Sequence, residues 1–287
     1  MSEAPDQKNP GQSLLSSIEA ISAEADPAQK AALDLMAGQV HELIAALDRT
    51  QSDVQEAKND KAKFVSVVTH ELRIPLTSIK GYTDLLRQGI VGPVNEQQTN
   101  FLNVIRGNVE RMTALISDLS DMSHIQSGRL KIQPKTVRIH DQIGDITKHW
   151  EPIFAEKQQV LHVEVSSELD SMAIDPDRFN QVLGYLLNNG QRYSPEGETV
   201  DLRVSPSGEN VRVEVQDRGI GISDDDQRHV FESFFRSEDA QVRDHPGWGL
   251  SLHVAMLLVN LMGGEMGFAS KLNAGSTFWF TIPVFSR

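Results

Sequence analysis

Residues 64–79 read FVSVVTHELRIPLTSI and lie within a long stretch of helical periodicity. No helix stop signal occurs from Leu33 to about Leu86, and Pro75 removes only one backbone hydrogen bond. Apolar residues at the start of this stretch recur at alternating steps of three and four, which is the heptad pattern of a coiled coil. We therefore predict a coiled-coil helix over residues 31–58; one amphipathic helix packed on its own domain is the alternative. The heptad positions are Leu33, Met36, Val40, Leu43, Leu47, Thr50, Val54, Ala57, Lys61, Phe64 and Val68.

A turn and a second helix follow the first. Residues 88–93 read QGIVGP, which breaks the helix, and Asn95 with Gln98 three residues later forms a capping-box pattern. The next apolar residues fall on one helical face, and Gly128 ends the helix. We predict a helical hairpin over residues 59–130 whose apolar stripe is buried by a second copy, giving a homodimeric four-helix bundle. That stripe contains Phe101, Leu102, Ile105, Val109, Met112, Leu115, Ile116, Leu119 and Met122.

The remaining residues have a different pattern. Residues 133–287 mix short alternating runs with helical ones, which predicts an α+β domain. Residues 1–30 contain three prolines and little apolar periodicity, and we expect a flexible leader there. The predicted strands are Leu161–Val165, Val200–Val204, Val211–Val215 and Thr277–Val284, and the predicted helices are Asp175–Arg192 and Leu250–Met262.

Composition excludes several classes of function. A formal net charge of −13 argues against binding to nucleic acid or to an anionic membrane surface. The absence of cysteine excludes disulfides, thiolate catalysis and zinc–thiolate sites. No signal peptide and no apolar run of about 20 residues occurs, so we expect a cytoplasmic protein without a membrane span. Either such a protein takes its signal inside the cell or the sequence is incomplete.

One histidine stands next to groups that suit nucleophilic chemistry. Imidazole is substantially unprotonated near neutral pH and is then a nucleophile. His70 is followed by Glu71, a carboxylate that can accept a proton if it reaches round the helix.

A second group of residues suits a nucleotide. Asn189 and Arg192 lie on one face of a predicted helix, where an amide oxygen can bind Mg²⁺ and a guanidinium can neutralise phosphate. Asp217 ends a predicted strand and could accept a hydrogen bond from the adenine amine. Gly247 and Gly249 open a predicted helix, whose free amides can bind phosphate.

These segments together resemble the sensor histidine kinases of two-component systems. The stretch from Thr69 to Ile79 is similar to their phosphoacceptor box, and residues 188–195 to their N-box. Residues 217–222, 230–236 and 247–252 resemble the first glycine box, the phenylalanine box and the second glycine box, in the family's order. The resemblance implies a signalling helix and dimerisation hairpin, followed by an α/β-sandwich ATP-binding domain of the GHKL type.

The family's roles carry over to matching positions. His70 becomes the phosphorylated residue, Glu71 its acid or base, and Asn189 the Mg²⁺ ligand. The stretch between the phenylalanine box and the second glycine box becomes a mobile lid over ATP. The residues implied to bind the nucleotide are Asn188, Asn189, Arg192, Tyr193, Asp217, Gly219, Gly221, Phe231, Gly247, Gly249 and Leu250.

The resemblance therefore implies ATP-dependent autophosphorylation and transfer to an aspartate of a response-regulator receiver domain. Ile74 replaces a polar residue that positions water for dephosphorylation, so we expect weak or absent phosphatase activity. Tyr185 replaces a second N-box asparagine, and Trp248 and Ser251 alter the second glycine box. These changes keep open a pseudokinase scaffold that binds nucleotide and partner without efficient turnover. An ATPase or protein-serine kinase on the same fold is a weaker alternative, since the His70 segment has no place in it.

Overall fold

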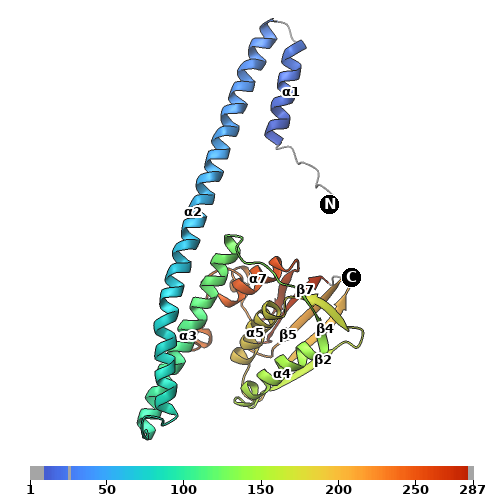
Figure 1. Ribbon diagram of the computed structural model, residues 1–287. Coiled ribbons are helices and arrows are strands. Elements are labelled where there is room, and N and C mark those ends of the chain that lie inside the picture. Colours follow the sequence, from blue (N-terminus) through green and yellow to red (C-terminus); the bar gives the residue numbers. More distant parts are fainter. Residues whose placement is uncertain (1–9, 25–26, 284–287) are drawn as a thin grey trace. The chain divides into compact units, whose positions relative to one another are not determined.

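The computed structural model describes residues 10–24 and 27–283, and the chain divides into two compact units between Lys63 and Phe64. In the first unit, α1 (Pro10–Glu24) lies beside the start of α2 (Pro27–Arg87), as Figure 1 shows. The Ser22 hydroxyl donates to Asp34 Oδ1 at 2.6 Å and ties the two helices together. Residues 10–24 are thus helical where a flexible leader was expected, because one face, including Ile18, is buried. Residues 1–9 and 25–26 of that expected leader lie outside the described residues.

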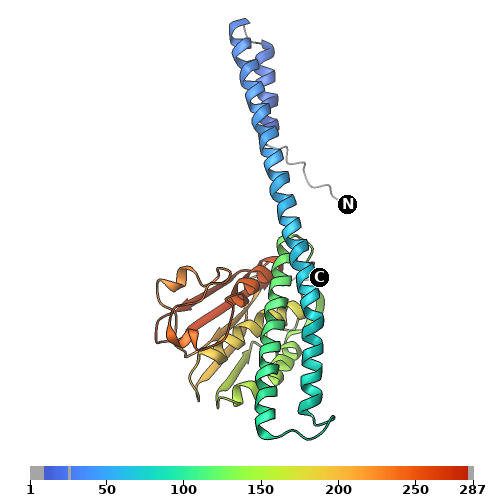
Figure 2. The ribbon, with the colours of Figure 1, turned by 90° about the vertical axis from the view of Figure 1, so that its left-hand side faces the viewer.

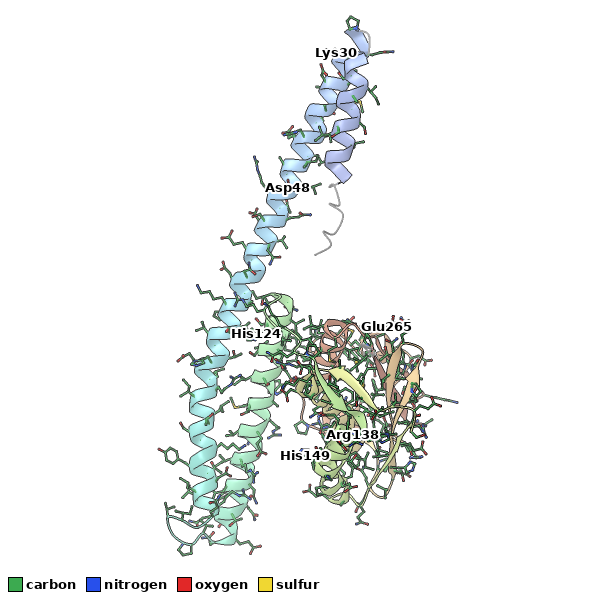
Figure 3. The ribbon with its side chains drawn as sticks, turned by 45° about the vertical axis from the view of Figure 1, so that its right-hand side comes forward. Lys30, Asp48, His124, Arg138, His149 and Glu265 are labelled. Carbon is green, nitrogen blue, oxygen red and sulfur yellow. The ribbon has the colours of Figure 1, made fainter. Side chains whose placement is uncertain are left out.

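The predicted long helix is confirmed. α2 passes through Pro75 without a break and covers the whole heptad pattern. Side chains of its first part extend into solvent, among them Lys30 and Asp48, which are labelled in Figure 3. The exposed heptad positions Leu43 and Leu47 leave an apolar stripe on this part of α2. Pairing of that stripe into a coiled coil remains a prediction.

The second unit begins with a helical hairpin, whose two helices lie side by side in Figure 2. The end of α2 is joined to α3 (Glu96–Gln126) by a loop in which Gly89 and Gly92 have φ values of 70° and 129°. The predicted capping box is present: the Gln98 amide donates to Asn95 Oδ1 at 2.8 Å, and the Asn95 amide donates to Gln98 Oε1 at 2.9 Å. A small buried cluster joins the two helices; it comprises Leu76, Val109 and Ile116.

The α+β domain is a sheet with one helical layer (Figure 1). Its strand order is β2-β4-β5-β7-β6, with β2 and β4 parallel and the other pairs antiparallel. α4 (Ile139–Ala155), α5 (Pro176–Tyr193) and α7 (Ser251–Leu261) cover one face. The strands are β2 (Val160–Val165), β4 (Thr199–Ser207), β5 (Asn210–Gln216), β6 (Met266–Ser270) and β7 (Ser276–Pro283).

The core lies between the sheet and these helices. Alternate β5 residues Val211, Val213 and Val215 are buried, as period-two strand geometry requires. Phe179 of α5 packs edge-on against Phe280 of β7, with ring centroids 5.7 Å apart. The strands and helices predicted for this domain are confirmed within one residue at each described end, except that β4 continues three residues beyond its predicted end, to Ser207. A two-stranded sheet of β1 (Lys135–Arg138) and β3 (Ser171–Ile174), together with α4 and β6, was not anticipated.

The end of α3 packs on this core. Met122 is buried in it, and Leu115, Leu119 and Ile125 pack against it. No helix among the described residues combines the length and apolarity that crossing a membrane would require.

Candidate active site

An open pocket lies at one end of the sheet. The end of α5, the loop after β5, the start of α7 and the lid segment (residues 237–247) form its walls. Seven of the residues expected to bind nucleotide line it: Asn189, Arg192, Tyr193, Asp217, Gly221, Gly247 and Gly249.

Asp217 provides a buried acceptor in this pocket. The side chain is 7% exposed, and its Oδ1 accepts the amides of Gly219 at 2.9 Å and Ser276 at 3.1 Å. Burial raises the pKa of this carboxyl above its usual value, and the two backbone hydrogen bonds partly oppose that rise. Because the two described bonds go to Oδ1, Oδ2 can accept the exocyclic amine of adenine.

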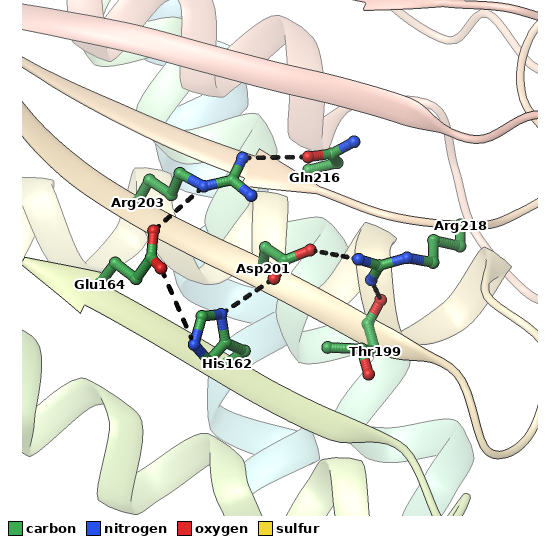
Figure 4. Close-up of polar contacts among 7 residues, drawn as sticks. All are labelled: His162, Glu164, Thr199, Asp201, Arg203, Gln216 and Arg218. Atoms are coloured by element: carbon green, nitrogen blue, oxygen red, sulfur yellow. Dashed lines mark hydrogen bonds and ion pairs between the residues drawn. The ribbon is translucent and has the colours of Figure 1, made fainter.

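The neighbouring Arg218 points to the other face of the sheet and anchors this strand end (Figure 4). Its guanidinium donates to Asp201 Oδ2 at 2.8 Å and to the Thr199 carbonyl. Asp201 also contacts His162 Nδ1 at 3.0 Å, so a network across β2, β4 and the segment directly after β5 supports the backbone beside Asp217.

The glycines are required by backbone packing as well as by any ligand. A Cβ on Gly219 would lie well under 3.0 Å from the Tyr193 carbonyl, and one on Gly221 would meet the Lys271 carbonyl equally closely. Gly249 has a φ of 67° and abuts the Phe235 carbonyl, a conformation that favours glycine. Gly219 is outside the pocket lining, so its place is explained by contact with the end of α5.

Two guanidinium groups line the pocket and bind the lid segment. Arg192 donates to the Pro246 carbonyl at 2.9 Å. Arg236 donates to the carbonyls of Gly247 at 2.9 Å and of Val242 and His245 at 2.6 Å each. Arg236 was missed from the sequence, although it ends the phenylalanine-box stretch. Both groups suit phosphate oxygens, which accept charge-assisted hydrogen bonds more strongly than neutral carbonyls do.

Further cationic groups lie behind these arginines. Lys157 Nζ donates to the carbonyls of Gln191 at 3.0 Å and Arg192 at 3.1 Å, at the end of α5. Burial, and then the charge of Arg192, lowers the pKa of Lys157. Burial also lowers the pKa of His245, and the charges of Lys157 and Arg192 lower it further. The electrostatic environment at this end of the pocket therefore favours an anion.

The remaining predicted residues lie outside the lining. Asn188 and Leu250 do not reach the pocket, and Leu250 is almost completely buried. Phe231 packs on Phe268 with ring centroids 5.6 Å apart. Ser251 and Trp248 line the pocket, and Trp248 is 54% exposed.

The chemistry of the donor set fits magnesium bound mainly by nucleotide. No cluster of three or more histidine, cysteine, aspartate or glutamate residues suited to a metal occurs in the part of the chain that the structure describes. Asn189 offers one amide oxygen at the pocket wall. Mg²⁺ commonly takes one or two protein ligands, with phosphates and water completing its shell.

His70 lies on the hairpin, outside the pocket lining. Its side chain is 68% exposed, and Nδ1 lies 3.2 Å from Glu71 Oε1. The Glu71 side chain thus reaches round the helix to the His70 ring, which was the condition for Glu71 to accept a proton. Ile74, one turn further on, is also exposed.

A one-sided sheet with this pocket defines a nucleotide-binding domain, and the hairpin attached to it carries an exposed nucleophile. Comparison with known proteins specifies both parts. Residues 60–128 match the His Kinase A (phospho-acceptor) domain, and residues 174–286 match the histidine kinase-, DNA gyrase B- and HSP90-like ATPase family.

Curated relatives align with most of this chain over part of their own, longer chains. The chain is 32% identical over 244 residues to the signal transduction histidine-protein kinase BarA of Escherichia coli, covering 83% of this chain and 26% of BarA. It is 32% identical over 246 residues to the circadian input-output histidine kinase CikA of Synechococcus elongatus, covering 83% and 32%. It is 30% identical over 238 residues to the autoinducer 2 sensor kinase/phosphatase LuxQ of Vibrio cholerae, covering 81% and 27%. The chain thus spans about a third or less of these relatives.

Solved structures agree on the fold. Full-length ShkA in complex with AMPPNP aligns with a TM-score of 0.66 at 24% identity, covering 78% of this chain and 46% of that one. The histidine kinase AdeS of Acinetobacter baumannii aligns with a TM-score of 0.54 at 21% identity, covering 76% and 98%. The chain belongs to the sensor histidine kinases of two-component systems.

Proposed function

We propose that this chain transfers the γ-phosphoryl group of ATP to His70 and then to an aspartate of a response-regulator receiver domain. The observation that carries the proposal is the 3.2 Å contact between Nδ1 of the exposed His70 and Glu71. A carboxylate that accepts the Nδ1–H bond fixes the tautomer in which Nε2 carries the lone pair. Nε2 is then the nucleophile, directed away from its own carboxylate.

The transfer step follows from this geometry. The Nε2 lone pair attacks the γ-phosphorus, the bond to the β–γ bridging oxygen breaks, and ADP leaves with that electron pair. Glu71 balances the positive charge that the ring acquires. Such transfers depend on positioning and charge neutralisation more than on covalent help from the protein.

The pocket supplies the other half of the reaction. Asp217 would bind the adenine amine, and Arg192 and Arg236 would bind phosphate oxygens in place of lid carbonyls. Asn189 would hold Mg²⁺ through its amide oxygen, and the ion supplies charge neutralisation at the β- and γ-phosphates.

A homodimer accounts for the exposed apolar surface of the hairpin. Several large side chains of α2 and α3 in the second unit are open to solvent, a pattern that usually marks an interface. A second hairpin would bury them in a four-helix bundle. These side chains are Phe64, Val67, Leu72, Ile79, Leu85, Phe101, Val104 and Met112.

We also propose that phosphatase activity is weak. LuxQ carries kinase and phosphatase in its name, whereas Ile74 gives this chain no hydrogen-bonding group one turn after His70 to position water. The pseudokinase alternative has one observation in its favour: Tyr185 does not line the pocket, so Asn189 is the only amide side chain there among the described residues.

The test incubates the chain with γ-labelled ATP and Mg²⁺. We expect acid-labile, alkali-stable label on the wild type and none on His70→Gln or Asn189→Ala. His140→Gln is the matched control, an exposed histidine of α4 that should label normally. Label that survives in His70→Gln contradicts the proposal, whereas nucleotide binding without label in the wild type supports the pseudokinase.

A further inference from the structure

A polar network joins the hairpin to the ATP-binding domain. It contains two carboxylates of α3, Asp118 and Asp121, which lie one turn apart. Facing them are three donors on successive turns of α5, Arg178, Gln181 and Tyr185. None of the five lines the nucleotide pocket.

The hydrogen bonds of this network run from α5 to α3. The Tyr185 hydroxyl donates to Asp118 Oδ1, and Gln181 Nε2 donates to Asp121 Oδ2 at 2.7 Å and to the Tyr185 oxygen at 3.0 Å. Arg178 donates to Asp121 Oδ1 at 3.1 Å and to Gln181 Oε1 at 2.7 Å. The arrangement therefore satisfies both carboxylates from the ATP-binding domain.

The carboxylates depend on this contact because they are buried by it. Asp118 is 9% exposed and Asp121 is 8% exposed, beside Leu115, Leu119 and Met122, which pack on the core of the domain. A buried carboxylate is costly without donors, so removing one donor weakens the whole contact. Burial raises the pKa of Asp118 to about 6, and the Tyr185 hydrogen bond opposes that rise.

Tyr185 extends from α5 to α3, and its hydroxyl forms a hydrogen bond between the ATP-binding domain and the hairpin. Meanwhile His70 stays exposed and contributes nothing to the pocket. The contact thus holds the ATP-binding domain on α3 while His70 lies outside the pocket lining.

We propose that Tyr185 and Asp118 form a latch that holds the ATP-binding domain away from His70, and that opening this latch limits the rate of autophosphorylation. The proposal rests on the proposed kinase function. Tyr185 is on this account a positioning residue, which acts on the domain and not on the nucleotide.

The first experiment measures single-turnover autophosphorylation of Tyr185→Phe at saturating Mg–ATP. We expect the rate to rise about tenfold, the usual effect of losing one hydrogen bond to a charged group, while the nucleotide Kd and the Mg²⁺ dependence stay unchanged. Tyr82→Phe is the matched control, since Tyr82 is 70% exposed on α2, and should leave the rate unchanged. A rate in Tyr185→Phe that is equal to or below that of the wild type overturns the latch.

A second measurement separates the latch from the kinase chemistry. The chain has no cysteine, so spin labels can be attached at Asn100→Cys on α3 and Glu209→Cys between β4 and β5, both exposed. The distance distribution between them should be narrow in the wild type and broad in Tyr185→Phe. If the distance distribution broadens in Tyr185→Phe but the wild type acquires no phosphoryl group from ATP, the latch is supported and the kinase proposal fails. An unchanged distance distribution overturns the latch.

Discussion

Replacement of Asp217 by asparagine should change which nucleotide the pocket accepts. The amide oxygen of the new side chain can still receive the two backbone amides of Gly219 and Ser276 that now bind Oδ1, at 2.9 and 3.1 Å. Its NH₂ group then occupies the place of Oδ2 and presents a donor to the pocket. The adenine amine is also a donor, so the asparagine NH₂ group and the adenine amine cannot form a hydrogen bond with each other.

The expected loss follows from the energy of one hydrogen bond. A hydrogen bond to a charged group contributes about 1.5–3 kcal/mol, which corresponds to roughly 10- to 100-fold in Kd. GTP carries a carbonyl where ATP carries the amine, so Asp217→Asn should bind GTP more tightly than the wild type does. The raised pKa of Asp217 shows that its charge is already costly, and the variant should keep its fold.

Isothermal titration calorimetry with ATP and with GTP measures both effects, and thermal unfolding checks the fold. Asp201→Asn is unsuitable as a control because Asp201 holds Arg218; Asp225→Asn, at an exposed carboxylate outside the lining, is suitable. The reasoning is refuted if Asp217→Asn binds ATP as the wild type does, or if ATP and GTP weaken equally.

Other parts of the molecule support three further predictions. Burial in the contact between α3 and the ATP-binding domain raises the pKa of Asp118 from 3.8 to about 6. The contact should therefore be strongest below pH 4 and weaken as the pH rises through 6. Asp118→Asn should abolish this pH dependence of the distance between the spin labels. The titratable groups that act on Asp118 are Tyr185 and Asp121, and Arg178 pairs with Asp121. Gly249→Ala should lower the thermal midpoint by several degrees, because φ is 67° and a Cβ meets the Phe235 carbonyl, whereas Gly144→Ala, with open space around it, should not. Ile74→Thr should raise the rate at which a phosphorylated receiver domain is dephosphorylated, measured by loss of label; an unchanged rate would mean that water is positioned otherwise.

Features encoded by neighbouring residues were predictable from the sequence. The capping box at Asn95 and the neighbouring strands β4 and β5 depend on local chemistry, and both predictions are confirmed. α4 was missed, although Ile139, Ile143 and Ile146 are spaced for one helical face and could have indicated it.

Features that depend on distant parts of the chain were not predictable. Arg236 is held in the pocket wall by hydrogen bonds to carbonyls of the lid segment, and its position in the sequence does not reveal these bonds. Tyr185 was interpreted from the sequence only as the replacement of an N-box asparagine, whereas its partner Asp118 lies on another helix, 67 residues away in the sequence. A pattern identifies which residue types are present, but tertiary packing decides what each side chain meets.

The lid carbonyls bound to Arg192 and Arg236 have a consequence for selectivity among anions. The cations are already solvated by the chain itself, so an incoming anion must replace four peptide oxygens before it gains anything. An anion with a single charge, such as chloride, forms too few charge-assisted hydrogen bonds to offset the loss of these carbonyl contacts. A triphosphate brings several charged oxygens at once, and can free the lid segment in the same event that secures the substrate.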